Sequence, residues 1–410
     1  AWDAWQNSTQ VLVESRLLLG DIAKAIEELA ATAGSKRKLE QVTALLQRAT
    51  ALEAKYIVKL LQGDLRIGLR EGAVEDALAR AAQVAVGEIQ RCNMLLGDIG
   101  ETALLARHQK LQTARLKLFH PIKFMLASPA EDLSDVARLM PPEFYVEDKF
   151  DGIRAQAHIG PHEENEDLHG IEYSGRRVAL FSRTLDEITR SFPDLVAPLA
   201  NLLDLQNCND SDCGLILDGE IVPLRDEKIA PFQELQKRLG RKVPTPEIME
   251  QHPVAFVAYD ILFAHRVLME CSGEERRHEL QQLQFNQTVL LAESKVFSDV
   301  QLLDDEFDAA RSRGNEGLMI KDPRAIYNPG RRGKEWLKIK RALATLDVVV
   351  TAVEVGSGRR NKFLSDYTFA VRASETDPTL LNVGKAYSGL TDKEIDVMSQ
   401  WFRAHTIQEF

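Results

Sequence analysis

The 410-residue sequence has no run of about 18 apolar residues, so it predicts no membrane-spanning segment. It has only four cysteines, Cys92, Cys208, Cys213 and Cys271, and their spacing matches neither a zinc site nor a disulfide framework. We therefore expect a reducing compartment. The chain begins with Ala1 and has no signal-like segment, which we interpret as a processed or partial chain.

An excess of positive charge is also missing. The chain carries 51 Lys and Arg side chains against 62 Asp and Glu side chains, which gives a net charge of −11. Residues 1–120 hold 16 basic and 14 acidic side chains, and the remainder holds 35 and 48. This balance speaks against a nucleic-acid partner for the chain as a whole. It does not exclude a local basic groove, because phosphate contacts depend on clustered Lys and Arg.

Proline is absent from residues 1–120, which favours long unbroken helices there. Leucine, isoleucine and alanine recur at three- and four-residue spacing over residues 11–29, 39–61 and 74–95. A connector at residues 62–72 (QGDLRIGLREG) contains three glycines and two arginines, Arg66 and Arg70. Small residues permit close approach of a phosphate chain. An ordinary loop with solvated arginines explains the connector equally well.

Residues 147–154 (EDKFDGIR) carry the most informative pattern. Alternating apolar residues on both sides predict two strand segments joined by a tight Asp-Gly turn. Such a turn would direct the Lys149 ammonium into a pocket and return Arg154 beside it. Lys149 is either a solvated surface cation or a nucleophile, since a partly desolvated lysine lowers its pKa readily. The complete Lys-x-Asp-Gly-x-Arg pattern favours the nucleophile.

Further strands follow. The strand at 178–183 ends in Arg183, a weak signal by itself, and residues 254–263 predict a central strand with Tyr259. At 214–224 an apolar run is interrupted by Asp-Gly-Glu. A carboxylate there is costly unless it is paired or bound to a cation, so Glu220 is a candidate for ribose or metal contact. The alternative is an exposed carboxylate at a strand-end turn.

A second cluster lies at residues 316–321 (EGLMIK) and 336–340 (WLKIK). Strand alternation places Lys338 and Lys340 on one face. Two like charges on one face repel, which makes sense if a polyphosphate lies against them. Exposed edge lysines that discourage aggregation are the alternative. Residues 331–334 (RRGK) add local positive charge.

The remaining stretches are predicted more coarsely. Residues 160–175 are expected to form a polar surface loop, and Arg276 and Arg277 a solvated helix surface. Beyond Ala344, residues 347–355 and 367–372 predict strands, and a capping box at 391–394 (TDKE) opens a helix to about residue 404.

These motifs, in this order and spacing, resemble those of ATP-dependent DNA ligases of the archaeal and eukaryotic type, within the nucleotidyltransferase superfamily. Residues 63–68 (GDLRIG) and 120–127 (HPIKFMLA) add to the resemblance. It implies a multidomain α+β protein with an all-α DNA-binding domain at 1–120, an α+β adenylation domain with antiparallel sheets at 121–343, and part of a β-barrel OB domain at 344–410. The family's last motif, a basic strand that helps expel pyrophosphate, has no counterpart here.

The resemblance also implies roles for single residues. Lys149 would attack the α-phosphate of ATP and carry AMP, while Glu147 would contact adenine and Tyr259 would stack on it. The alternative for Tyr259 is core packing. Glu220 and Glu316 would hold Mg²⁺, with Mn²⁺ as a substitute. Further contacts to the nucleotide would come from Arg154, Arg183, Glu220, Lys321, Lys338 and Lys340. Contacts to DNA would come from Arg66, Arg70 and Arg183.

The implied activity is the sealing of nicks in double-stranded DNA, by a monomer that encircles the duplex in the cytoplasm, nucleoid or nucleus without a membrane partner. Two other functions stay open. An RNA ligase or capping enzyme would share the central motifs but normally lacks a helical domain of this size. A non-catalytic DNA-binding protein with a relict site would not need Lys149, Glu220, Glu316 and Lys338 intact.

Overall fold

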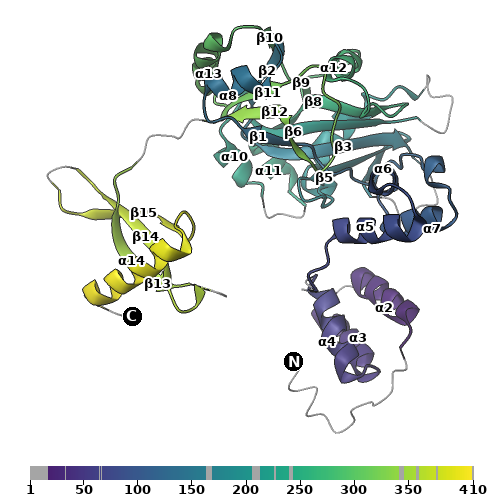
Figure 1. Ribbon diagram of the computed structural model, residues 1–410, viewed down its shortest axis with the longest axis horizontal. Coiled ribbons are helices and arrows are strands. Elements are labelled where there is room, and N and C mark those ends of the chain that lie inside the picture. The colour runs from purple at the N-terminus through teal and green to yellow at the C-terminus, as the bar shows by residue number, and fades with distance from the viewer. Residues whose placement is uncertain are drawn as a thin grey trace.

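The computed structural model describes residues 17–32, 34–63, 65, 67–162, 169–205, 213–225, 228–239, 243–340, 346–356, 360–374 and 377–408. These residues form an N-terminal set of helices, a central body with two sheets, and a C-terminal sheet with one helix (Figure 1). None of the helices in these ranges is long and apolar enough to cross a membrane.

The N-terminal region is helical, as predicted, but its helices are shorter than expected. They are α2 (Leu19–Ala31), α3 (Ser35–Gln47), α4 (Ala51–Leu61), α5 (Glu71–Ala82), α6 (Val86–Leu96) and α7 (Ile99–Arg107). The single helices expected over 39–61 and 74–95 are therefore wrong. Thr50 and Glu53 form a capping box that starts α4 anew. Gln83, with φ of 58°, adopts the left-handed conformation that ends α5.

The helices belong to two hydrophobic cores. Helices α3 and α4 share a small core around Leu45 and Ile57. Helices α5–α7 instead pack against the central body, where Ile89 and Leu95 join a cluster with Trp336. Ion pairs between Lys123 and Glu71, and between Arg91 and Glu270, cross the same contact. The second half of the helical region is thus anchored on the central body.

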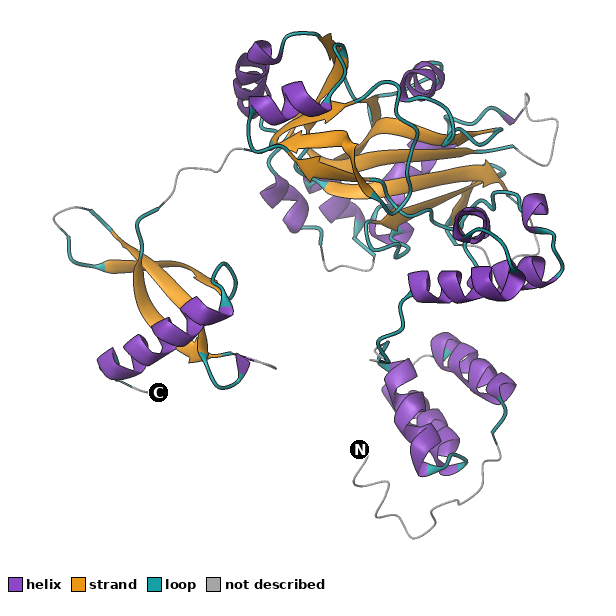
Figure 2. Cartoon of the chain, viewed as in Figure 1, coloured by secondary structure: helices purple, strands orange, loops and turns teal. Residues whose placement is uncertain are grey.

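Two sheets form the central body (Figure 2). The first has the order β1 (Leu126–Pro129), β12 (Arg332–Ile339), β11 (Gly317–Lys321), β2 (Phe144–Lys149), β10 (Ser294–Phe297). The second has the order β4 (Ile171–Tyr173), β5 (Arg176–Ser182), β3 (Ile153–Pro161), β6 (Leu215–Arg225), β8 (Val254–Ala264), β9 (Val289–Leu291), with β7 (Lys228–Ile229) paired to β6. The antiparallel pairing expected from the resemblance holds except for two parallel pairs, β1 with β12 and β8 with β9.

Short helices surround the sheets: α8 (Leu133–Leu139), α9 (Val196–Ala200), α10 (Phe232–Gln236), α11 (Pro246–Gln251), α12 (Gly273–Gln281) and α13 (Leu303–Ser312). The main core packs strands of the second sheet against α9, α10 and α12, through residues such as Leu217, Phe256 and Leu280. A further core joins the first sheet to α8 and α13.

The turn after Lys149 joins two sheets and does not form a hairpin. Strand β2 ends at Lys149 and pairs with β10 and β11, whereas β3 begins at Ile153 and pairs with β5 and β6. A Cβ atom on Gly152 would lie 2.4 Å from the carbonyl oxygen of Ile221, so glycine is required at this crossing. Lys149 therefore stands where the chain passes from one sheet to the other.

Three expectations about the surface and the cysteines were wrong. Part of the expected loop at 160–175 is strand, because β3 extends to Pro161 and β4 begins at Ile171. Arg276 is only 2% exposed. Cys213 is disulfide-bonded, whereas Cys92 and Cys271 are free thiols, so the cysteines no longer argue for a reducing compartment.

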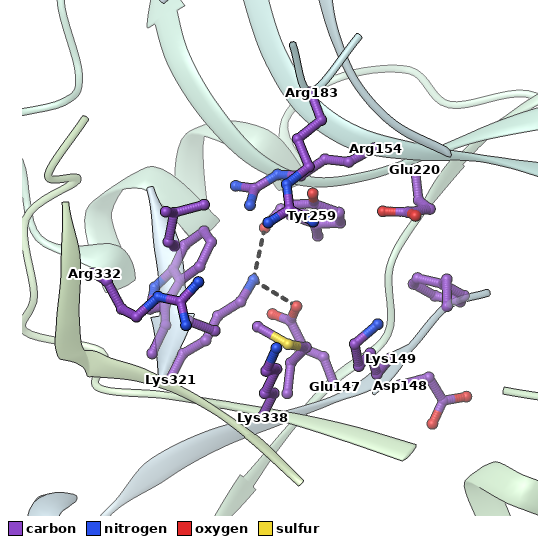
Figure 3. A pocket seen from close by; sticks show the side chains of 15 residues that line it. Glu147, Asp148, Lys149, Arg154, Arg183, Glu220, Tyr259, Lys321, Arg332 and Lys338 are labelled. Carbon is purple, nitrogen blue, oxygen red and sulfur yellow. Dashed lines mark hydrogen bonds and ion pairs between the residues drawn. The ribbon is translucent and has the colours of Figure 1, made fainter. Parts of the chain in front are cut away.

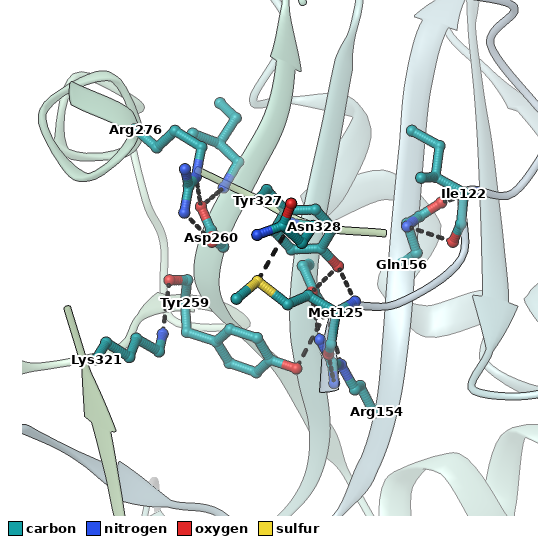
Figure 4. Close-up of polar contacts among 12 residues, drawn as sticks. Ile122, Met125, Arg154, Gln156, Tyr259, Asp260, Arg276, Lys321, Tyr327 and Asn328 are labelled. Carbon is teal, nitrogen blue, oxygen red and sulfur yellow. Dashed lines mark hydrogen bonds and ion pairs between the residues drawn. The ribbon is translucent and has the colours of Figure 1, made fainter. Parts of the chain in front are cut away.

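Arg276 is buried because it pairs with a buried carboxylate on β8. Its Nε and Nη2 atoms lie 2.8 and 3.1 Å from the two carboxylate oxygens of Asp260. Its Nη1 donates to the backbone oxygens of Cys271 and Ala325 at 2.7 and 3.1 Å. The guanidinium thus ties α12, β8 and the segment after β11 together (Figure 4).

We expect Arg276→Ala to lower the free energy of unfolding by about 3–5 kcal/mol, because it leaves the Asp260 carboxylate buried without its charge partner. Denaturant unfolding measures the difference. Arg324→Ala is the matched control, since Arg324 pairs with Asp322 at the surface and its loss should change stability little. Equal unfolding curves for the two variants would contradict the structural role of Arg276.

The C-terminal sheet is antiparallel, in the order β13 (Val349–Val355), β14 (Leu364–Arg372), β15 (Leu380–Ala386), and carries helix α14 (Asp392–His405). The predicted capping box is confirmed, since Thr391 accepts from the Glu394 amide and Glu394 accepts from the Thr391 amide. Ser399 anchors the helix by accepting a 2.9 Å hydrogen bond from the Leu364 amide. The described residues of this region hold three strands and one helix, which do not make a closed barrel. The OB assignment and the boundaries at 120 and 343 therefore stay predictions.

Candidate active site

A cavity of about 160 Å³ is walled by strands of both central sheets (Figure 3). Its lining consists of Leu126, Ala127, Glu147, Asp148, Lys149, Phe150, Arg154, Arg183, Glu220, Tyr259, Met319, Lys321, Arg332, Trp336 and Lys338. The structure thus brings together residues that are up to 212 positions apart in the chain. Apart from Lys340, every residue predicted to contact the nucleotide lies in this wall.

Glu316 lies directly beside the predicted nucleophile. The Nζ atom of Lys149 is 2.7 Å from Oε2 of Glu316, and Lys340 pairs with the same oxygen. Burial alone would raise the pKa of Glu316, but the hydrogen bonds from both lysines outweigh it and lower the pKa. The carboxylate is therefore ionised at neutral pH. Lys340 thus joins the site through Glu316.

Two further carboxyl groups flank this ion pair. Burial raises the pKa of Glu220 to about 8, against opposing effects of Lys149 and Arg154. Burial and the neighbouring Glu316 also raise the pKa of Asp151, a residue that sequence reasoning had treated only as part of the turn. Carboxylate oxygens are the ligands that Mg²⁺ prefers, and a cation would favour their ionised forms. Among the described residues, no ready-made cluster of three metal-binding side chains occurs.

The raised pKa of Glu220 predicts a pH-dependent stability. Its ordinary value is 4.5, so the folded protein binds this proton more tightly than the unfolded chain does. The resulting stabilisation is complete below about pH 4.5 and is lost as pH rises to about 8, with a slope of at most about 1.4 kcal/mol per pH unit. Without metal, the free energy of unfolding of the wild type should fall relative to Glu220→Gln across this window. Urea unfolding at several pH values measures it, and parallel curves would contradict it.

Away from Lys149, the cavity is lined by two aromatic rings and by an ion pair between Lys321 and Glu147. Nζ of Lys321 lies 2.6 Å from Oε2 of Glu147, and both side chains are buried. The ammonium also lies 4.9 and 4.6 Å from the ring centroids of Tyr259 and Trp336. Figure 3 shows Lys321 reaching toward Glu147 and Tyr259. The structure therefore makes Lys321 a partner of Glu147 in the cavity wall.

Arg154 is held by a carboxylate that sequence reasoning missed as a site residue. Its Nε and Nη2 donate to the two oxygens of the fully buried Asp218 at 3.1 and 2.7 Å, and its Nη1 donates to the Met125 carbonyl at 2.7 Å. The hydroxyls of Tyr259 and Tyr327 donate to the same carboxylate at 3.1 and 2.8 Å (Figure 4). One N–H on each of Nη1 and Nη2 is left for a ligand. The cost of a carboxylate in the apolar run at 214–224 could have pointed to Asp218 as well as to Glu220.

Three cations of the cavity wall form no ion pair with another described residue. They are Arg183, Arg332 and Lys338. Burial, followed by the nearby Lys340 and Arg332, lowers the pKa of Lys338. Arg332 lies on the same strand as Trp336 and Lys338 and lines the same cavity, whereas the sequence indicated only local positive charge there. An anion is the ligand that such a set of cations favours.

Of the two connector residues predicted to contact DNA, the structure describes only Arg70, which does not line the cavity. Arg70 is exposed at the N-terminal cap of α5. Arg66 lies outside the described residues. The connector folds back on α4 at one point, where the Lys59 ammonium donates to the Leu65 carbonyl at 2.9 Å.

Two family models match this chain. Residues 124–340 match the model described as "ATP dependent DNA ligase domain", and residues 1–79 match "DNA ligase N terminus". The chain belongs to the ATP-dependent DNA ligase family. The first model covers the whole cavity wall, including Lys149, Glu220 and Lys338.

Similar proteins include other ligases. A probable DNA ligase of Koribacter versatilis is 46% identical over 96% of this chain and 68% of its own length. A DNA ligase of Archaeoglobus fulgidus is 32% identical, with the same coverage of both chains, and a probable DNA ligase of Opitutus terrae is 39% identical over 95% of this ligase and 42% of its own length. The solved structure "Pmar-Lig_PreS3" shares the fold, with a TM-score of 0.56 and 19% identity over 97% of this chain and 80% of that one. This chain therefore spans about two thirds of the first two relatives and less than half of the third.

Proposed function

We propose that this ligase seals nicks in double-stranded DNA with ATP and Mg²⁺, through a lysyl-AMP intermediate on Lys149. The observation that carries the proposal is the position of Lys149. Its ammonium lies 2.7 Å from the Glu316 carboxylate, in the wall of a cavity that is also lined by the Tyr259 and Trp336 rings and by the cations Arg183, Arg332 and Lys338. The cavity thus combines a nucleophile with aromatic residues that could bind a nucleobase and cations that could bind phosphate.

The aromatic end would take the adenine. The Tyr259 and Trp336 rings lie 6.5 Å apart between centroids and offer flat apolar surface. Lys321 occupies one oxygen of Glu147, so the carboxylate keeps capacity to accept a hydrogen bond from the exocyclic amine of adenine. The free N–H groups of Arg154 would reach the ribose. Asp218 fixes their direction.

In the first step, the neutral amine of Lys149 attacks the α-phosphorus of ATP. A nitrogen–phosphorus bond forms, the bond to the bridging oxygen breaks, and pyrophosphate leaves with that electron pair. The Lys149 ammonium, which lies 2.7 Å from Oε2 of Glu316, must first lose one proton to solvent. Arg183, Arg332 and Lys338 would hold the phosphate oxygens where charge gathers.

Glu316, with Glu220 and Asp151 nearby, would hold Mg²⁺, and Mn²⁺ could replace it. A bound divalent cation neutralises charge on the phosphates during transfer. The residues fit this ion because Glu316 is ionised and binding would favour ionisation of the other two.

The second and third steps use DNA. An oxygen of the 5′-phosphate at the nick attacks the AMP phosphorus and releases Lys149. The 3′-hydroxyl then attacks the activated 5′-phosphate, closes the backbone and releases AMP. We propose that the helical region and Arg70 contact the duplex, which the monomer encircles, and that the protein acts in the cytoplasm, nucleoid or nucleus.

A gel assay separates this function from its alternatives. Nicked DNA and nicked RNA of one sequence are incubated with the protein, ATP and Mg²⁺. We expect ligated product from DNA and little from RNA. If the protein sealed only RNA, the proposal would be wrong and the protein would be an RNA ligase. If it formed neither protein–AMP nor ligated product, it would be a DNA-binding protein with a relict site.

A further inference from the structure

Asp148, the residue before the nucleophile, has partners of its own. Because side chains alternate along β2, it points away from Lys149, as Figure 3 shows. Its carboxylate is only 18% exposed, and Arg313 donates to both of its oxygens, from Nε at 2.8 Å and from Nη2 at 2.6 Å. Asn315 donates a third hydrogen bond at 2.8 Å. Three donors from one short segment thus converge on this carboxylate.

That segment also supplies Glu316. Helix α13 ends at Ser312 and β11 begins at Gly317, so residues 313–316 form the connector between them. The Glu316 amide donates to the Lys149 carbonyl at 2.8 Å, and the two side chains form their ion pair on the cavity side. The connector therefore contacts the end of β2 on both faces. Arg313 and Asn315 bind Asp148 on one face, and Glu316 binds Lys149 on the other.

In the described part of the chain, the end of β2 has few other contacts that would fix its position. Lys149 is the last residue of the strand, and the chain leaves it for the other sheet at once. Gly317, which pairs with Lys149, has a φ of 155°, and a Cβ atom there would lie 2.2 Å from the Ile339 carbonyl oxygen. The connector thus enters β11 along a path that only glycine permits. Among the described strands, only β11 pairs with Lys149, because the pairing with β10 ends at Glu147.

We propose that Asp148, Arg313 and Asn315 form a clamp that positions the Lys149 amine against Glu316 for the adenylation step. These are positioning residues, because they act on the reacting atoms through the two strand ends. The inference rests on the proposed lysyl-AMP chemistry. Small displacements of a nucleophile cost large factors in rate, whereas a binding site with many other contacts tolerates them.

The clamp has an outer layer that provides a control. Arg313 also donates to Glu306 at 2.7 Å, and Lys295 lies 2.9 Å from the same carboxylate. Glu306→Gln removes this outer charge pair but leaves both contacts of Arg313 to Asp148. Arg313→Lys keeps the positive charge but loses the bidentate hydrogen bonding to Asp148. Asp148→Asn keeps the volume of the side chain and loses its charge.

The test is single-turnover self-adenylation with labelled ATP over a range of ATP concentrations, beside thermal unfolding of each variant. For Arg313→Ala and Asp148→Asn we expect the maximal rate to fall at least about tenfold, while the ATP concentration at half-maximal rate changes less than about threefold. Arg313→Lys should restore part of the rate, and Glu306→Gln should stay close to wild type. Sealing of a nick that already carries AMP does not use the Lys149 amine and should be affected much less.

Three results would overturn the clamp. They are an unchanged maximal rate in Arg313→Ala and Asp148→Asn, a loss in Glu306→Gln equal to theirs, or losses in rate that only follow losses in thermal stability and extend equally to the sealing of the pre-adenylated nick. Failure of the proposed function would look different: the wild-type protein itself would then form no lysyl-AMP. The wild-type reaction therefore distinguishes the two failures.

Discussion

Lys149→Ala will form no protein–AMP when it is incubated with labelled ATP and Mg²⁺. The cavity contains other lysines, but Lys321 is paired with Glu147, and Lys338 lies on a different strand among the phosphate-binding cations. The substitution removes the amine that lies 2.7 Å from Glu316 in the cavity wall; Lys340 pairs with the same carboxylate but does not line the cavity. Denaturing gel electrophoresis at alkaline pH, which leaves the phosphoramidate intact, measures the label on the protein.

Two further variants sharpen this result. Lys149→Arg should also fail, because a guanidinium stays protonated at any working pH. Lys334→Ala should label like the wild type, since Lys334 is exposed on β12 and does not line the cavity. Lys149→Ala should keep its fold, because Glu316 retains its pair with Lys340. Clear labelling of a folded Lys149→Ala protein would remove Lys149 from its role.

Glu316→Gln is expected to slow self-adenylation on the order of a hundredfold at ordinary Mg²⁺. The amide keeps the volume of the side chain but loses the charge that attracts the cation and holds two lysines. Raised Mg²⁺ or Mn²⁺ should restore part of the rate, because the weakened site would then fill. The measurement is the initial rate of protein–AMP formation as a function of metal concentration.

A shift in the metal dependence identifies the role of Glu316. If Glu316 only oriented Lys149, its loss would lower the rate at every metal concentration by the same factor. Glu270→Gln is a control, since Glu270 forms an exposed pair with Arg91 far from β2 in sequence. Wild-type rates for Glu316→Gln at ordinary Mg²⁺ would show that the carboxylate is structural.

The sequence was most informative where a short motif carries both a chemical group and its geometry. Lys149 and Arg154 share a six-residue pattern, and the structure places both in the cavity wall. Lys338 could be assigned because strand alternation fixes the face on which it lies. For these residues, the spacing within a short stretch of sequence is sufficient to predict on which side of the strand each side chain lies.

What could not be predicted depends on partners that are distant in the chain. Asp218 and Arg154 are 64 positions apart, and Arg313 and Asp148 are 165 positions apart. Arg276 follows a helical pattern typical of solvated surface, and only the fold places it against Asp260. The crossing from β2 to β3 could not be distinguished from a hairpin, because both need the same tight turn.

The most direct measurement of the central claim follows one label through the three steps. The protein is loaded with labelled ATP and Mg²⁺, freed of unbound nucleotide, and mixed with nicked DNA in the absence of ATP. We expect the label to leave Lys149, to appear at the DNA 5′-phosphate, and to be released as AMP as the nick closes. Label that stays on the protein while nicks are sealed, or sealing by unloaded protein without ATP, would contradict it.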